Sequence, residues 1–219
     1  MRLCLLNDLH PYLPRKSRKT DLSEWAFDDI AERFEKLRGF RLLPIGRTKN
    51  ITHLTTAQIV AGILSIATAK PGYAGLAAKA LSGLCPVGGP DASFQRCENF
   101  GKALEVALTD EAALDSLIEI RVSDSEMYTN AHGRAAISYR SGDQTLTAYY
   151  ISAHAGSLLQ PGAEKTFNPR DLISSIVTEQ ILYPPFLKGV ANVLKRERGT
   201  QRRAELPDRL RRLVLLQNP

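Results

Sequence analysis

The sequence predicts an α+β protein: an N-terminal helical, helix-turn-helix-like domain, followed by a domain with a three-stranded antiparallel sheet packed by helices. Two observations support this order. Apolar residues recur at helical spacing in the first part of the chain, whereas from Leu117 they alternate with a period of two. Between these patterns, the segment from Cys85 to Pro90 holds two glycines and two prolines, which is typical of a linker.

These patterns divide the 219 residues into five segments. We expect a basic flexible arm, a helical DNA-binding-like domain, a linker, an α+β domain and a basic C-terminal helix or tail, over residues 1–20, 21–84, 85–92, 93–195 and 196–219. Hydrophobic residues make up 43% of the chain and charged residues 24%, which is typical of a folded globular protein.

Three helices are predicted in the first domain. Residues 22–38 carry apolar side chains at helical spacing, and Gly39 provides the end of that helix. Thr55 and Gln58 match a capping box that opens a second helix. A third helix, rich in Ala and Leu, covers residues 73–84. Three short helices with a basic turn between them are typical of a helix-turn-helix variant.

The second domain is predicted to begin with a helix over Ser93–Leu108 and to continue into strands. The three strands are expected at Leu117–Val122, Arg134–Arg140 and Thr145–Ser152. Asn168 followed by Pro169 is typical of a helix start, and the pair Pro184-Pro185 is expected to end that helix. Another helix is predicted from Phe186.

Adjacent tyrosines in the third strand raise the question of a stacking surface for single-stranded nucleic acid. Tyr149 and Tyr150 must point to opposite faces of a sheet, and Tyr139 lies on the neighbouring strand. We therefore interpret all three as ordinary packing residues rather than as a platform for bases.

Positive charge is concentrated toward both ends of the chain. Residues 15–49 carry a net charge of +4, residues 50–186 carry −4, and residues 187–219 carry +6. Clustered cations are favoured by phosphate backbones, because each neutralised phosphate releases counterions. The alternative interpretation is solvated, flexible ends. The residues we expect to bind duplex DNA are Arg15, Lys16, Arg18, Lys19, Arg38, Arg41, Arg47 and Lys49.

The turn around Arg47 and Lys49 is the strongest of these candidates. Gly46 frees the backbone there, while apolar residues before the turn and the capped helix after it would hold it in place. A turn held in this way loses less entropy on binding than the arm at residues 15–19. A solvated surface turn without a partner is the competing interpretation.

A homodimer is expected from surplus apolar residues near the C-terminus. More apolar positions occur over residues 172–194 than one face of a three-stranded sheet can cover, and an exposed surplus marks an interface. The expected interface residues are Ile173, Ile176, Val177, Ile181, Phe186 and Val190. A two-fold dimer also matches a palindromic DNA site.

No motif in the chain predicts catalysis. The four histidines and three cysteines lack zinc-ligand spacing, and no phosphate-cradling or dinucleotide motif occurs, so we expect no metal and no cofactor. Asp124, Glu126, Asn130 and His132 form the most enzyme-like group, but a polar loop whose side chains hydrogen-bond to their own backbone is the better interpretation. We expect a cytoplasmic protein that is not an enzyme, has no membrane segment and is exposed to a reducing compartment.

The segment from Leu37 to Pro44, the Gly46-Arg47 turn and the Leu54-Thr55 helix start resemble a loose group of bacterial phage and mobile-element accessory proteins with a helix-turn-helix-like segment near the N-terminus. The resemblance implies an accessory or regulatory role and DNA binding. We therefore expect a DNA-binding transcriptional regulator. The alternative is a protein-binding inhibitor of a host defence system, of the anti-CRISPR kind, whose partner is a host protein complex and which can also bind DNA.

Overall fold

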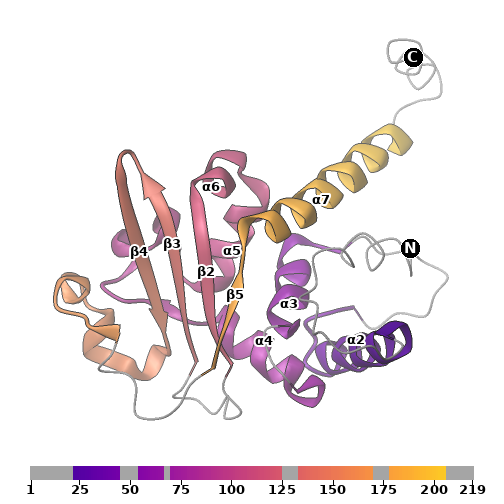
Figure 1. Ribbon diagram of the computed structural model, residues 1–219, viewed down its shortest axis with the longest axis horizontal. Coiled ribbons are helices and arrows are strands. Elements are labelled where there is room, and N and C mark those ends of the chain that lie inside the picture. Colours follow the sequence, from indigo (N-terminus) through magenta and orange to yellow (C-terminus); the bar gives the residue numbers. More distant parts are fainter. Residues whose placement is uncertain (1–21, 45–53, 67–69, 125–132, 170–177, 206–219) are drawn as a thin grey trace. The chain divides into compact units, whose positions relative to one another are not determined.

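The computed structural model describes residues 22–44, 54–66, 70–124, 133–169 and 178–205 (Figure 1). The fold is a mixture of helices and one antiparallel sheet, so the predicted α+β class is confirmed. The described residues up to Pro184 form one compact unit. Those from Pro185 onward belong to a second unit, which contains nearly all of the long helix α7 (Pro184–Glu205).

Three α-helices precede the sheet at the predicted places. They are α2 (Leu22–Gly39), α3 (Thr56–Ile66) and α4 (Ala74–Ser82). The predicted capping box of α3 is confirmed, because the Thr55 N–H donates to the Gln58 side-chain oxygen at 2.9 Å and the Gln58 N–H donates to the Thr55 hydroxyl at 3.3 Å. Each bond satisfies a donor that the first turn of a helix leaves unpaired.

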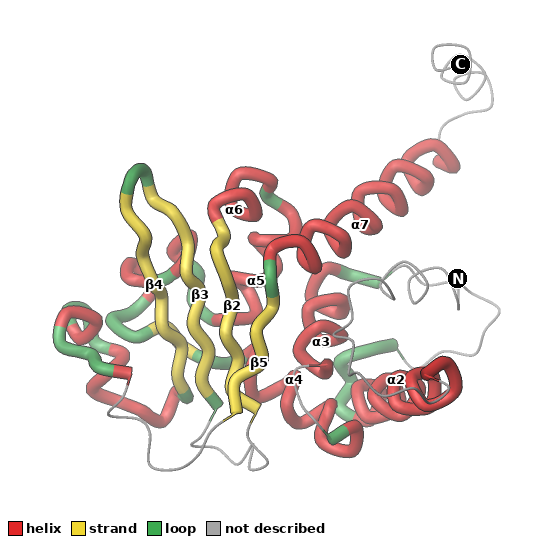
Figure 2. The backbone as a smooth tube through the Cα atoms, in the orientation of Figure 1, coloured by secondary structure: helices red, strands yellow, loops and turns green. Residues whose placement is uncertain are grey.

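The sheet has five antiparallel strands, not three, in the order β1-β4-β3-β2-β5. Figure 2 shows β4, β3, β2 and β5 side by side. The three predicted strands are its centre, as β2 (Leu117–Asp124), β3 (Arg134–Ser141) and β4 (Gln144–Ile151). Two strands were missed. They are β1 (Cys85–Pro86), which pairs with the end of β4, and β5 (Thr178–Leu182), which pairs with all but the first residues of β2.

Strand β5 corrects the predicted helix after Asn168. Residues 170–177, including Ile173, Ile176 and Val177, lie outside the described residues, but Ile181 is a strand residue opposite Arg121 of β2. The outer edge of β2 carries backbone groups that need partners, and pairing with β5 supplies them. Tertiary pairing therefore decides the state of a segment whose apolar residues alone are compatible with a helix.

Two other helix boundaries differ from the prediction because of caps and prolines. Helix α5 (Phe100–Thr109) begins at Phe100 and not at Ser93. Asn99 caps this start, because its side chain accepts a hydrogen bond from the Lys102 N–H. The short helix α6 (Glu111–Ser116) follows, capped by Asp110. The pair Pro184-Pro185 begins α7 instead of ending a helix, because the first turn of a helix tolerates the missing N–H of proline.

Short 3-10 helices fill the connections. They lie at Pro71–Tyr73, Pro90–Ala92, Phe94–Arg96, Ala153–Leu159 and Ala163–Lys165. The predicted linker contains β1 and the 3-10 helix Pro90–Ala92. Across it, the Phe100 N–H donates a hydrogen bond to the Leu84 carbonyl at 2.9 Å. The predicted division of the chain at residues 85–92 stays a prediction.

One face of the sheet is the core of this unit. Its inward side chains, such as Ile120, Val122 and Ile137, are fully buried. Tyr150 packs against Phe100 of α5 on this face, with ring centres 5.3 Å apart, while Tyr149 points to the other face and lies 5.2 Å from Phe167. The predicted opposition of these two tyrosines is confirmed.

Tyr150 provides a pH-dependent test of this core. Its buried hydroxyl accepts a hydrogen bond from the Phe94 N–H at 3.1 Å, and burial raises the pKa of the phenol well above its usual 10.0. We expect Tyr150→Phe to reduce the free energy of unfolding at neutral pH by about 1–3 kcal/mol, because the Phe94 N–H is left buried without a partner.

The difference in the free energy of unfolding between the wild type and Tyr150→Phe should become smaller at alkaline pH. Above the pKa of the unfolded phenol, unfolded Tyr150 releases its proton while folded Tyr150 keeps it, so rising pH destabilises the wild type through this group. Tyr150→Phe lacks that loss. Tyr139 and Cys97, whose pKa values burial also raises, are present in both proteins. Urea unfolding at neutral pH and at about pH 10.5 measures the difference; a constant difference contradicts the buried position of the hydroxyl.

Candidate functional site

The end of α2 is closed by a specific backbone motif. The Leu42 N–H donates to the Leu37 carbonyl and the Arg41 N–H donates to the Arg38 carbonyl, each at 2.9 Å. These are the two hydrogen bonds of a Schellman motif. In this motif the residue that donates the shorter-range bond adopts a left-handed conformation. That residue is Arg41, with φ of 58°. The predicted stop at Gly39 is therefore not the position where the backbone turns.

An arginine at this position is unusual. Glycine occupies it in most helices, because a side chain is strained in the left-handed region. Arg41 is exposed, so packing of its side chain in the core does not account for the choice. A residue held against its conformational preference at an exposed helix end is a candidate for a functional contact.

Helix α4 passes very close to this end of α2. A Cβ atom placed on Gly75 would lie 2.5 Å from the Phe40 ring and 2.6 Å from the Lys36 carbonyl oxygen. Only a glycine permits this approach. Lys79 stands one turn further along α4, on the same face as Gly75, because residues four apart lie one above the other on a helix.

The crossing of these two helices therefore carries four exposed cations. We call Lys36, Arg38, Arg41 and Lys79 the basic patch. Within the described part of the chain, none of the four forms an ion pair. Their charge is thus available to a partner.

Arg33 fixes α2 beneath the basic patch. Its guanidinium is nearly buried and donates to the carboxylate of Asp29 and to the Ser65 carbonyl near the end of α3. The last carbonyl groups of a helix lack partners within the helix, and Arg33 supplies one from α2. This cation serves the fold, whereas those of the basic patch do not.

The structure places two of the predicted nucleic-acid contacts in the basic patch, namely Arg38 and Arg41. The other predicted contacts, Arg15, Lys16, Arg18, Lys19, Arg47 and Lys49, lie outside the described residues. Lys36 and Lys79 were missed. One sequence signal could have found them: residues 36–90 contain seven Lys or Arg and no Asp or Glu.

The predicted dimer residues are distributed over three parts of the chain. Ile181 is partly exposed on β5, Phe186 and Val190 lie on α7, and the remaining three are outside the described residues. Val190 is buried. The helix-mediated interface stays a prediction.

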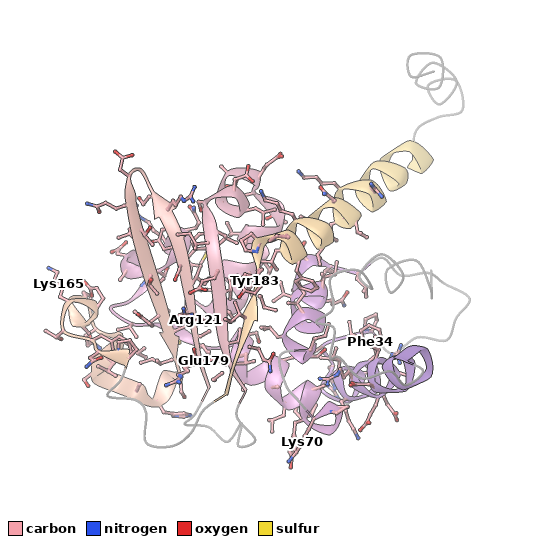
Figure 3. The ribbon with its side chains drawn as sticks, viewed as in Figure 1. Phe34, Lys70, Arg121, Lys165, Glu179 and Tyr183 are labelled. Carbon is pink, nitrogen blue, oxygen red and sulfur yellow. The ribbon has the colours of Figure 1, made fainter. Side chains whose placement is uncertain are left out.

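The open face of the sheet holds a hollow of about 340 Å³. Figure 3 shows Arg121 and Glu179 on this face. Arg134 forms an ion pair with Glu179 at 3.2 Å, and Arg121 forms one with Glu119 at 2.6 Å. Because each cation already has a carboxylate partner, the hollow offers phosphate no net attraction. The Nε atom of Arg134 is nevertheless buried without a hydrogen-bond partner among the described residues.

The side chains suited to catalysis or metal binding are not assembled in the described part of the chain. Burial raises the pKa of the Cys97 thiol, and Glu98 and Glu105 add to the shift, so this cysteine is not an activated nucleophile. No group of three His, Cys, Asp or Glu suited to a metal ion occurs among the described residues. Of the predicted loop cluster only Asp124 is described, at the end of β2.

None of the helices in the described ranges is both long enough and apolar enough to cross a membrane. No family model, no curated protein and no solved structure matches this chain.

Proposed function

We propose that this protein is a DNA-binding transcriptional regulator of a phage or mobile element and that it contacts duplex DNA through the basic patch. The observation that carries the proposal is the set of four exposed cations at the crossing of α2 and α4, none of which forms an ion pair with another described residue. Phosphate contacts supply most of the affinity of such proteins, and they require cations that no carboxylate already neutralises.

Rigid support favours binding by the basic patch. Arg38 and Arg41 lie on a helix end whose backbone is fixed by two hydrogen bonds, and Gly75 brings α4 directly against it. Cations on a fixed backbone lose less conformational entropy on binding than cations on a free chain. Glu32 and Glu35 lie one helical turn before Lys36 and Arg38, but neither carboxylate forms an ion pair with a described residue.

The helix-turn-helix-like arrangement is part of this proposal. The three helices have the predicted order, and α3 and α4 follow one another through the short connection at residues 67–73. Most side chains of α4 are buried, with Lys79 as its exposed cation. In our proposal α4 therefore supports α2 and adds one phosphate contact, while Arg38 and Arg41 approach the DNA most closely.

Binding to a duplex library at several salt concentrations tests the proposal. We compare the wild type with a triple variant, Lys36→Gln, Arg38→Gln and Lys79→Gln, using fluorescence anisotropy. The logarithm of the association constant should fall less steeply with salt in the variant, by about 2 to 3 units of slope, because each lost phosphate contact removes about 0.9.

A matched control removes exposed cations elsewhere. Figure 3 shows Lys165 beyond the β4 edge of the sheet and Phe34 of α2 beyond the β5 edge. Arg140 is exposed at the end of β3. Lys165→Gln with Arg140→Gln should bind as the wild type does. If the wild type does not bind duplex DNA, or if the control loses as much affinity as the triple variant, the proposal is wrong. A host protein captured in a nuclease-treated pull-down would then favour the alternative function, a protein-binding inhibitor of a host defence system.

A further inference from the structure

Strand β4 has an edge that is only partly covered. Strand β1 pairs with Ile151 and Tyr150, and the Val87 N–H donates to the Tyr149 carbonyl at 2.9 Å. The chain then leaves the edge, because the Gly88 N–H donates to the Leu158 carbonyl instead. The rest of β4, from Gln144 to Ala148, is the outermost part of the sheet among the described residues (Figures 1 and 2).

The direction of the free backbone groups follows from the pairing with Val87. Backbone N–H and C=O groups of a strand alternate between its two neighbours. Since the carbonyl of Tyr149 faces β1, the backbone groups of Thr145 and Thr147 face the same side, where they meet no described strand. Two donors and two acceptors thus stand in a row at this edge.

Natural proteins protect such edges with charges, prolines or bulges, because an unprotected edge pairs with another strand. β4 has none of these, since residues 144–151 read Gln-Thr-Leu-Thr-Ala-Tyr-Tyr-Ile. Leu146 is 40% exposed on the same edge strand, on the face that Tyr150 shares. The edge is neutral, β-branched and partly apolar.

We propose that the free edge of β4 pairs with the same edge of a second copy of this chain, so that the two sheets join about a two-fold axis. A neutral strand meets no charge repulsion from its own copy, and an antiparallel strand pair is compatible with that symmetry. The contact is distinct from the helical interface expected from the sequence, and it does not depend on DNA binding.

One register fits the edge. When Thr145 of each copy is opposite Thr147 of the other, all four free groups on each strand are paired, giving four hydrogen bonds across the axis. The two Leu146 residues then face one another in a non-hydrogen-bonded pair, where Cα atoms approach to about 4.5 Å. Sliding the strands toward Tyr149 would compete with Val87 for its carbonyl.

Two variants remove the pairing by different means. Thr145→Pro deletes an N–H that faces the free edge and not β3, so it leaves the internal ladder intact. Leu146→Lys places two like charges directly opposite one another at the axis. Thr145→Val and Leu146→Met are the matched controls, since they keep the N–H and the apolar contact.

Light scattering after size exclusion, over a series of micromolar concentrations and without DNA, measures the mass. We expect twice 24.2 kDa for the wild type and both controls. Thr145→Pro and Leu146→Lys should raise the dimer dissociation constant by about tenfold or more. A monomeric wild type overturns the proposal. A dimer that resists both variants but dissociates on Phe186→Asp would also overturn it and would place the interface on α7.

Discussion

Gly75→Ala should destabilise the protein by about 2 kcal/mol. The added methyl group would enter the space of the Lys36 carbonyl oxygen, 2.6 Å away, and of the Phe40 ring. The ring is partly exposed and can rotate, but the carbonyl belongs to the backbone of α2 and moves only with the helix. Overpacking of this kind costs about 1–3 kcal/mol, of which the better helix propensity of alanine returns part.

Gly62→Ala is the control for the same substitution. Gly62 lies inside α3, and a Cβ atom there would have no atom of the described residues within 4 Å. Alanine should therefore stabilise the protein by up to about 1 kcal/mol, through helix propensity alone. Urea unfolding of both variants gives the two free energies. Equal effects at the two positions would contradict the close crossing of α2 and α4, and with it the geometry of the basic patch.

Arg33→Leu should cost about 2–3 kcal/mol, since hydrogen bonds to charged groups contribute about 1.5–3 kcal/mol. The substitution removes the guanidinium that donates a hydrogen bond to the buried Ser65 carbonyl, while leucine keeps much of the side-chain volume. The effect should exceed that of a surface ion pair, because the arginine also donates to a buried carbonyl group.

Asp29→Asn separates the two contacts of Arg33. The carboxylate of Asp29 is 43% exposed, so solvent screens its attraction to Arg33, and its loss should cost less than about 1 kcal/mol. Thermal unfolding of both variants tests this inequality. A larger loss for Asp29→Asn than for Arg33→Leu would mean that the ion pair, and not the link from α2 to α3, holds the helices together.

Features encoded by neighbouring residues could be predicted from the sequence. The capping box of Thr55 and Gln58 forms both of its hydrogen bonds. The alternation from Leu117 predicted β2, β3 and β4 to within two residues. In each of these cases the signal lies within a few positions of the element that it specifies.

Features that depend on distant partners could not be predicted. β1 is two residues long and includes a proline, and it is a strand only because β4 provides its partner. β5 has the apolar composition of a helix as well as of a strand, and the edge of β2 decides between them. The left-handed Arg41 also gave no signal, since glycine is the residue from which such a turn is normally inferred.

The candidate site was predicted in part. Arg38 and Arg41 were chosen for their charge, and the structure brings them together at one helix end. Lys79 joins them only through the close passage of Gly75, which periodicity does not reveal. The hollow on the open face of the sheet was not predicted, since it requires residues from β2, β3, β4 and β5 together.

Arg41→Gly tests the central claim most directly, because stability and DNA binding should change in opposite directions. Glycine relieves the left-handed strain, so we expect about 1 kcal/mol of added stability and a rise in Tm of about 2–4 °C. The affinity of Arg41→Gly for duplex DNA should fall, and the slope of the logarithm of the association constant against the logarithm of the salt concentration should be smaller by about 0.9. Arg41→Lys should retain most of the binding, because it keeps the charge. A more stable Arg41→Gly protein that binds duplex DNA with wild-type affinity and salt slope would contradict the account.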